Sequence, residues 1–339
     1  MFKTILAATD QVTQRDLLVE TAAHLAAANR GRLVILHVLE SASTQNRRRV
    51  IHYATGQDLQ CDKDYEDQLY RQLRVAHRAA IDVAPVSQVR VATGYPWAEI
   101  LRGARRDDAD LIVMGPHSGR AFRKGVVRTV GQVGSTAEGV IRREKCPVMI
   151  VNPHLPDPDL HVQRILVGID FSEACECALC FAGRLAKCYG AKVFAFHMLP
   201  IPPYPKYTRR DYEADRSRAS ERLLYFCREY LEGTDWSGHI RGGVQPHRAL
   251  LDRAAKARAD LIVLGSHTRR SQGKWYPGSA VERVSYRANC PVIVINDPEA
   301  LQPWEDMQAS LAHEKPSKDR LIRVFTGRTT PERSTQTEL

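Results

Sequence analysis

The residues of this chain that could carry chemistry occur twice, once in each half. An aspartate ends a short apolar run, a histidine follows within a second run, and a Gly-Ser pair precedes a Cys-Pro step. The copies are Asp10 and Asp170, His37 and His197, Gly134-Ser135 and Gly278-Ser279. The segment before the second Gly-Ser pair carries Arg269, Arg270 and Lys274 and no acid, which suits a phosphate-bearing ligand.

The common motifs of hydrolytic and phosphoryl-transfer enzymes are absent. The sequence holds no Gly-x4-Gly-Lys-Ser/Thr loop, no Gly-x-Ser-x-Gly elbow and no His-Glu-x-x-His helix. No two acids are placed by their spacing as a general acid and a general base. We therefore assign no catalytic residue, and we expect a binding protein rather than an enzyme.

Four of the eight cysteines lie between residues 175 and 188. Helical periodicity places Cys175 on an inward face and Cys177, Cys180 and Cys188 on an outward face. Metal binding, redox reactivity and simple packing all stay open for them. Packing is favoured, because structural zinc takes four ligands and no second pair stands nearby. We assign no metal ligand.

Charge and composition restrict the class of protein. The chain has 339 residues, 43% of them hydrophobic, and a formal net charge of +10. Residues 1–152 and 153–296 share the basic excess, which favours anionic ligands at two sites over a nucleic-acid arm, without excluding weak non-specific nucleic-acid binding. No apolar run reaches the length of a membrane span, and no signal peptide is recognisable, so we expect a cytoplasmic protein without a membrane partner.

The chain repeats itself in order. Asp110-Leu-Ile-Val-Met-Gly115 matches Asp260-Leu-Ile-Val-Leu-Gly265, and Cys146-Pro-Val-Met-Ile-Val151 matches Cys290-Pro-Val-Ile-Val-Ile295. Each half alternates short strand-like runs with helical segments, which predicts a parallel, doubly wound α/β sheet. The expected strands are 3–9, 33–39, 87–93, 110–114 and 147–151, then 164–169, 191–198, 238–243, 260–264 and 291–295. Ligands of such sheets bind at the carboxyl ends of the strands, where the strand order reverses.

These motifs together resemble the universal stress protein family in its tandem form. The resemblance implies two five-stranded, doubly wound domains of the adenine nucleotide alpha-hydrolase-like type. We expect domain one over residues 1–152 (half one), a linker over 153–162, domain two over 163–296 (half two) and a mostly irregular tail over 297–339.

The nucleotide-binding members of that family carry Gly-x2-Gly-x9-Gly-Ser/Thr, with the strand-one aspartate and the residue after the strand-two histidine framing the nucleoside. Half two keeps the outer spacing but has Thr268 at the second glycine. Half one is six residues longer there, and its second glycine comes one residue late. The resemblance implies nucleotide-site residues Asp170, Ser172, Met198, Gly265, Thr268, Gly278 and Ser279 in half two. The weaker site of half one comprises Asp10, Val38, Gly115, Gly119, Gly134 and Ser135.

Each of these assignments has a structural alternative. Asp10 and Asp170 are either ligands or helix N-caps, and the Gly-Ser pairs serve either phosphate or the start of the last helix. A hydrogen-bonded structural role is favoured for His37 and His197 over a catalytic one.

The favoured function is a non-catalytic stress-response protein that binds ATP or another adenine nucleotide, mainly in half two. One alternative is a slow ATPase or phosphotransfer protein with Mg²⁺ near Asp170 and Ser279. The other is a ligand-free interaction scaffold. The last strands of the two halves are expected to pair within one chain. The sequence leaves open a homodimer and the identity of a protein partner, and it predicts no specific nucleic acid.

Overall fold

The computed structural model describes residues 1–41, 48–53, 55–117, 133–155, 158–202, 207–266 and 280–296. Residues 1–301 form one compact unit. The expected tail over 297–339 lies outside the described residues.

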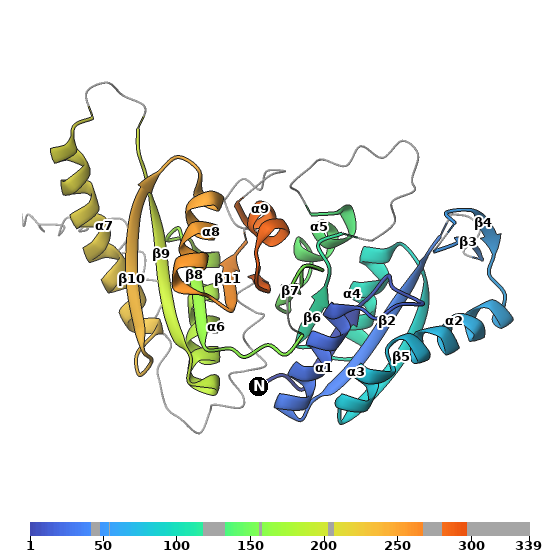
Figure 1. The fold of residues 1–339 in the computed structure, drawn as a ribbon. Coiled ribbons are helices and arrows are strands. Elements are labelled where there is room, and N and C mark those ends of the chain that lie inside the picture. Colours follow the sequence, from blue (N-terminus) through green and yellow to red (C-terminus); the bar gives the residue numbers. More distant parts are fainter. Residues whose placement is uncertain are drawn as a thin grey trace, which may run out of the picture. The chain divides into compact units, whose positions relative to one another are not determined.

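Ten strands from both halves form one continuous sheet (Figure 1). Half one contributes the order β5-β2-β1-β6-β7 and half two the order β12-β11-β8-β9-β10. The strands of half one are β1 (Thr4–Ala8), β2 (Arg32–Glu40), β5 (Val86–Gly94), β6 (Leu111–Met114) and β7 (Val148–Ile150). Those of half two are β8 (Arg164–Ile169), β9 (Lys192–Pro200), β10 (Trp236–Gly243), β11 (Leu261–Gly265) and β12 (Val292–Ile295). The ten predicted strands are confirmed to within two residues at each end.

The two halves join where β12 pairs with β7. This pair is antiparallel, with Val292 opposite Ile150, whereas the other neighbouring strands of the sheet run parallel. The predicted pairing of the final strands is thus present within the chain. Both strands are fully buried, so the joint belongs to the core.

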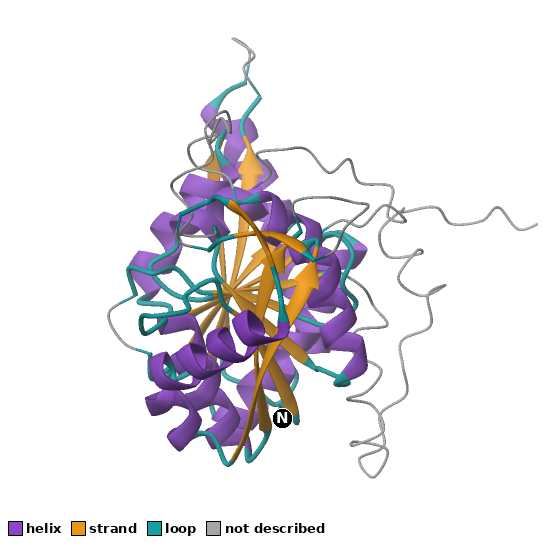
Figure 2. Cartoon of the chain, turned by 90° about the vertical axis from the view of Figure 1, so that its right-hand side faces the viewer, coloured by secondary structure: helices purple, strands orange, loops and turns teal. Residues whose placement is uncertain are grey.

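Helices cover both faces of the sheet (Figure 2). They are α1 (Leu17–Asn29), α2 (Lys63–Ala76), α3 (Arg78–Val83), α4 (Pro96–Arg106), α5 (Ser135–Ile141), α6 (Glu173–Tyr189), α7 (Arg209–Tyr230), α8 (Pro246–Ala257) and α9 (Ala280–Arg287). Apolar side chains of α4, α5, α8 and α9 form one core cluster with strands of both halves. These four helices therefore belong to one layer. No described helix combines the length and apolar character needed to cross a bilayer.

Half one also contains an antiparallel hairpin of β3 (Arg49–Ile51) and β4 (Asp58–Gln60), which the sequence did not predict. Each strand has only three residues, too few for a periodic pattern.

Side-chain contacts fasten the two halves beside the sheet joint. The buried Asn152 side chain donates to the carbonyl oxygens of Ser285 and Ala288, at 3.0 and 2.9 Å. On α6, the Phe181 ring lies 6.4 Å from that of Phe2, measured between centroids. The contact between Phe2 and Phe181 places α6 against half one as well as against the sheet.

The predicted outward position of Cys177 is wrong. Cys177 is 7% exposed, whereas Cys180 is half-buried and Cys188 is exposed. The reason is that α6 has neighbours on more than its sheet face. A Cβ on Gly183 would lie 2.5 Å from the Tyr230 carbonyl oxygen, so the end of α7 presses directly on α6. Cys175 is buried as expected.

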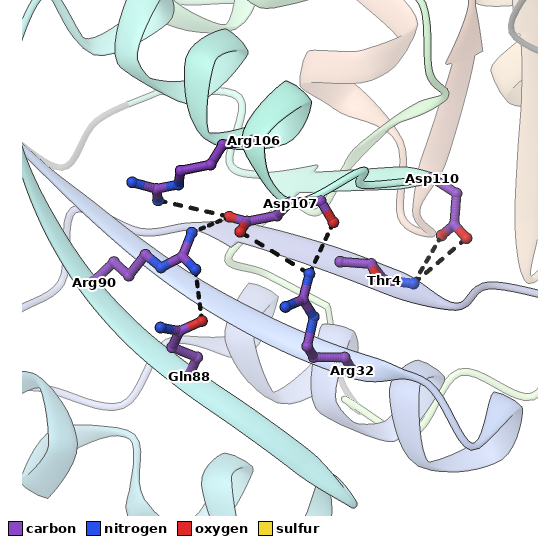
Figure 3. A network of polar contacts seen from close by, with 7 residues as sticks. All are labelled: Thr4, Arg32, Gln88, Arg90, Arg106, Asp107 and Asp110. Atoms are coloured by element: carbon purple, nitrogen blue, oxygen red, sulfur yellow. Dashed lines mark hydrogen bonds and ion pairs between the residues drawn. The ribbon is translucent and has the colours of Figure 1, made fainter.

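The aspartate of each Asp-Leu-Ile-Val repeat accepts hydrogen bonds from the backbone at the start of a neighbouring strand, β1 in half one and β8 in half two. Asp110 accepts a 2.7 Å bond from the Lys3 backbone N–H and longer bonds from Thr4 N–H (Figure 3). Asp260 does the same for Gln163 and Arg164. Burial raises the pKa of Asp110 to about 6, and it also raises the pKa of Asp260.

A buried ionic network lies near Asp110 in half one (Figure 3). The Asp107 carboxylate, 3% exposed, pairs with Arg90, and the Asp107 carbonyl oxygen accepts from Arg32 at 2.8 Å. Arg106 lies 3.6 Å from the same carboxylate, and Gln88 orients Arg90. Arg32 begins β2, so this network lies away from the carboxyl ends of the strands.

Candidate functional site

The strand order of half two reverses around β8, which has β9 on one side and β11 on the other. The three expected residues Asp170, Met198 and Gly265 lie at or near the carboxyl ends of these strands. They therefore gather at the switch point, where doubly wound sheets bind ligands.

Asp170 begins a tight turn from β8 into α6. Its Oδ1 accepts bonds from the Ser172 backbone N–H at 3.0 Å and from the Ser172 hydroxyl at 2.5 Å. Ser172 is the N-cap of α6, and its Oγ accepts from the Cys175 backbone N–H at 3.2 Å. The alternative of Asp170 as an N-cap is wrong, because Ser172 holds the N-cap position of α6 and accepts from an N–H group of its first turn.

An aromatic and cationic cluster stands beside this turn. The Phe171 ring lies 4.6 Å from His197 and 5.4 Å from Phe226, between centroids, and the Arg222 guanidinium lies 4.1 Å above it. Phe171 has φ +63°, which is uncommon for a bulky residue. Neither Arg222 nor Phe226 stands out in the sequence, because their place near Asp170 depends on how α7 crosses the strand ends.

His197 has the structural role favoured from the sequence. Its Nδ1 lies 2.8 Å from the Ile169 carbonyl oxygen. Burial, with a smaller contribution from Arg222, lowers the pKa of His197. The neutral ring therefore links β9 to the end of β8, directly before Asp170.

Gly265 is a glycine because α6 passes directly over it. A Cβ there would lie 2.3 Å from the Ala174 carbonyl oxygen and 2.6 Å from the Cys175 nitrogen. Its φ is not positive, so the requirement is for space rather than for a left-handed conformation. The end of β11 thus meets the first turn of α6 with no side chain between them.

Half one builds the corresponding turn differently. Eight residues separate β1 from α1, where half two has three between β8 and α6. The N-cap is Asp16, which accepts from Leu18 N–H at 3.2 Å, so the N-cap alternative for Asp10 is also wrong. Asp10 accepts instead from the Gln11 amide at 3.1 Å, and His77 bonds the Gln11 carbonyl oxygen at 2.9 Å.

The histidine contact is common to both halves. His37 Nδ1 lies 2.9 Å from the Thr9 carbonyl oxygen, so it repeats the bond of His197, and it is fully buried. Val38, the expected nucleoside contact, is 7% exposed on β2.

In half one, the backbone at the start of the last helix, α5, already forms a hydrogen bond within the chain. The Gly134 backbone N–H donates to the Pro116 carbonyl oxygen at 2.7 Å, and Gly134 is the N-cap of α5, with Ser135 as its first helical residue. A Cβ on Gly134 would lie 3.2 Å from His117 Nδ1. The His117 ring in turn meets Tyr286 of α9 at 5.0 Å. Gly115 meets nothing closer than 3.3 Å at its own Cβ position.

The remaining predicted residues lie outside the described part of the chain: Gly119, Thr268, Gly278 and Ser279. Within the described residues no group of three or more His, Cys, Asp or Glu side chains could hold a metal ion.

The universal stress protein family model matches residues 1–152 and 161–296. A universal stress protein of Mycobacterium tuberculosis (strain ATCC 25618 / H37Rv) is 28% identical over 195 residues, which are 56% of this chain and 62% of that protein. One of Mycolicibacterium smegmatis is 32% identical over 170 residues, 48% of this chain and 55% of that protein. Each match spans less than two thirds of the relative's length.

Solved structures show the same fold. The crystal structure of a universal stress protein from Archaeoglobus fulgidus matches with a TM-score of 0.57 at 21% identity, over 86% of this chain and 98% of that one. A functionally unknown protein from Pseudomonas aeruginosa matches with a TM-score of 0.53 at 14% identity, over 91% of this chain and 98% of that one.

Proposed function

The chain belongs to the universal stress protein family, and on this premise we propose that it is a non-catalytic stress-response protein whose half two binds an adenine nucleotide. The observation that carries the proposal is the gathering of Asp170, Met198 and Gly265 around the strand-order switch of half two. Ligands of doubly wound sheets bind at this position.

The described residues fit a nucleoside at this edge. The bonds from Ser172 fix the Asp170 carboxylate at the edge before any ligand arrives, and Gly265 places no side chain there. By family resemblance, Asp170 and the backbone of Met198 would frame the nucleoside. Thr268, Gly278 and Ser279 would receive the phosphates, and Mg²⁺ would enter only together with them.

Half one has a mainly structural role in this proposal. The Gly134 N–H that a phosphate would need already donates to Pro116, and the His117 ring lies against the same position. The carboxylate of Asp10 accepts from its own neighbour, Gln11. We expect any nucleotide affinity of half one to be much weaker than that of half two.

The output of binding would be a change of shape or of partner, with the nucleotide favouring one conformer. The segment that would hold the phosphates leads directly into α9. The last turn of α9 is held by Asn152 of half one, so a shift of α9 would be transmitted across the joint.

Native mass spectrometry of the undialysed protein, followed by ATP titration calorimetry, tests the proposal. We expect one ATP or AMP bound per chain, and we expect Gly278→Val to weaken ATP binding at least tenfold. Gly134→Val is the matched variant in half one and should leave ATP binding within about twofold. No bound nucleotide and no heat at millimolar ATP would leave a ligand-free scaffold in place of this proposal.

Labelled ATP tests the non-catalytic part separately. We expect no turnover above the buffer rate with or without Mg²⁺. Turnover that disappears in Ser279→Ala would replace the proposal with a slow ATPase.

A further inference from the structure

Helices α8 and α9 present five basic side chains that have no acidic partner in the described part of the chain. This α8–α9 basic face consists of Arg248, Arg253, Lys256, Arg283 and Arg287. Four are exposed, and Arg253 is half-buried with its guanidinium 5.5 Å above the Phe194 ring. Of the two acids on these helices, Asp252 is exposed and pairs with Arg241 of β10 at 2.9 Å, and Glu282 is 4% exposed.

Cations of both helices act on one histidine. The pKa of His247 is lowered by burial and then by Arg283, Arg287 and Arg248. Helices α8 and α9 pack against each other (Figure 1), so these three side chains contribute to one positive region. A different set of cations, with Arg253 first and Lys256 among them, lowers the pKa of His239 on β10 after burial.

Three basic side chains of the corresponding helices in half one have an acid within ion-pair distance. Arg102 of α4 pairs with Glu99, Arg106 lies 3.6 Å from Asp107, and Arg142, which follows α5, lies 3.2 Å from Glu138. The layer is the same, so the difference lies in the side chains and not in the fold.

We propose that the α8–α9 basic face binds the phosphate backbone of double-stranded nucleic acid without sequence specificity. No large hydrophobic side chain of α8 or α9 is exposed among the described residues. A protein partner usually needs apolar anchors, and a single strand needs aromatic side chains for base stacking. A duplex backbone needs only spaced cations. The 12 residues of α8 cover roughly 18 Å, about the length of five phosphates of one strand.

This surface shares α9 with the proposed nucleotide site, because Gly278 and Ser279 directly precede Ala280, the first residue of α9. Asp170 and Gly265 lie at the carboxyl ends of the strands, away from the five cations of this face. ATP titration of the same variants therefore separates a loss at the nucleotide site from a loss at the basic face.

Fluorescence anisotropy with a fluorescein-labelled 24-base-pair duplex of random sequence tests it on the full chain. The variant Arg248→Gln/Arg283→Gln/Arg287→Gln should weaken binding of the duplex at least tenfold at 50 mM NaCl. It should also make the slope of log K against log salt shallower by about 2.7. The matched variant Arg102→Gln/Arg106→Gln/Arg142→Gln removes the same charge from half one and should change affinity less than threefold. Thermal midpoints within about 2 °C of the wild type show that both variants fold.

Two results would overturn the inference. An equal loss in both variants would mean that the total charge binds the duplex and that no face is selected. A labelled poly-glutamate peptide that binds more tightly than the duplex, and loses affinity in the half-two variant, would assign the face to an acidic protein instead.

Discussion

At the end of α4 in half one, Asp107 is buried against Arg90 and Arg32, whereas the corresponding position at the end of α8 in half two is Ala257. The correspondence is supported by the backbone, because the next residues, Asp108 and Arg258, both have a left-handed φ, of 47° and 49°. Around this point half one forms an ionic network, and half two has no carboxylate at the position of Asp107.

The turns that follow β8 and β1 also differ between the two halves. Half two has a three-residue turn held by Asp170 and Ser172, and half one has an eight-residue connection held by Asp16 and His77. The backbone scaffold is common to both halves, as are the bonds of His37 and His197. The two halves therefore show that one fold can keep its sheet contacts while its surface charge and its ligand edge diverge.

Asp107→Ala should give the largest effect, because it leaves the largely buried Arg90 without its carboxylate. We expect the free energy of unfolding to fall by about 3–5 kcal/mol, measured by chemical denaturation. The matched variant is Asp235→Ala in half two, whose partner Lys192 occupies the position of Arg32 and whose side chain is 69% exposed. It should cost less than about 1 kcal/mol, and equal losses would contradict the contrast between buried and exposed networks.

Gly265→Ala should destabilise the protein by about 2–3 kcal/mol, because the added Cβ would lie 2.3 Å from a backbone oxygen that cannot move alone. Gly115→Ala places its Cβ at ordinary or slightly tight contacts and should cost less than about 1 kcal/mol. Thermal and denaturant midpoints compare the two. A Gly115→Ala variant that loses as much as Gly265→Ala would show that the two strand ends pack alike.

Asn152→Ala should lower the free energy of unfolding by about 2 kcal/mol, because it removes two bonds to buried carbonyl groups at the joint. Asn296 is its counterpart in half two, and its side-chain nitrogen and oxygen are buried without a hydrogen-bond partner among the residues that the structure describes. Asn296→Ala should leave stability unchanged or raise it by up to about 1 kcal/mol. A loss in Asn296→Ala equal to that of Asn152→Ala, measured by denaturation, would mean that the joint is symmetric.

The smallest expected effect concerns the glutamate four residues after the N-cap of α6, Glu176, and its counterpart in α1, Glu20. Burial, with Glu173 and Glu229 nearby, raises the pKa of Glu176 from 4.5 to about 7. The stability that its neutral form contributes is therefore present below about pH 4.5 and is lost as the pH rises through about 7. Relative to Glu176→Gln, the wild type should lose on the order of 1 kcal/mol over this range, allowing for solvent screening.

Glu20 of half one provides the control, since it accepts two bonds from Arg15. Glu20→Gln should lower stability at pH 7 by less than about 1 kcal/mol. Denaturation series from pH 4.5 to 8 measure both effects. A difference between wild type and Glu176→Gln that does not change with pH would contradict the assignment.

Much of the candidate site could be predicted from the sequence. Asp170 and Gly265 follow from strand ends that short β-branched runs and repeated motifs reveal, and Met198 follows from the family resemblance. The structural role of His37 and His197 follows from their place in those runs. Their convergence at one edge follows from the rules of doubly wound sheets. The role of Ser172 as the α6 N-cap, and that of Asp16 in α1, required the structure, because several polar residues near each turn were equally suitable as caps.

The sequence by itself determined the duplication, the alternation of strands and helices within each half and the family, because these properties depend on local periodicity and on the spacing of motifs. The tertiary structure decided the burial of Cys177, the cluster of Phe171, Arg222 and Phe226, and the unequal neutralisation of α4–α5 and α8–α9. These features depend on contacts between residues far apart in the chain. Whether a side chain meets an acid, a ring or solvent there is set by packing, which no local pattern records.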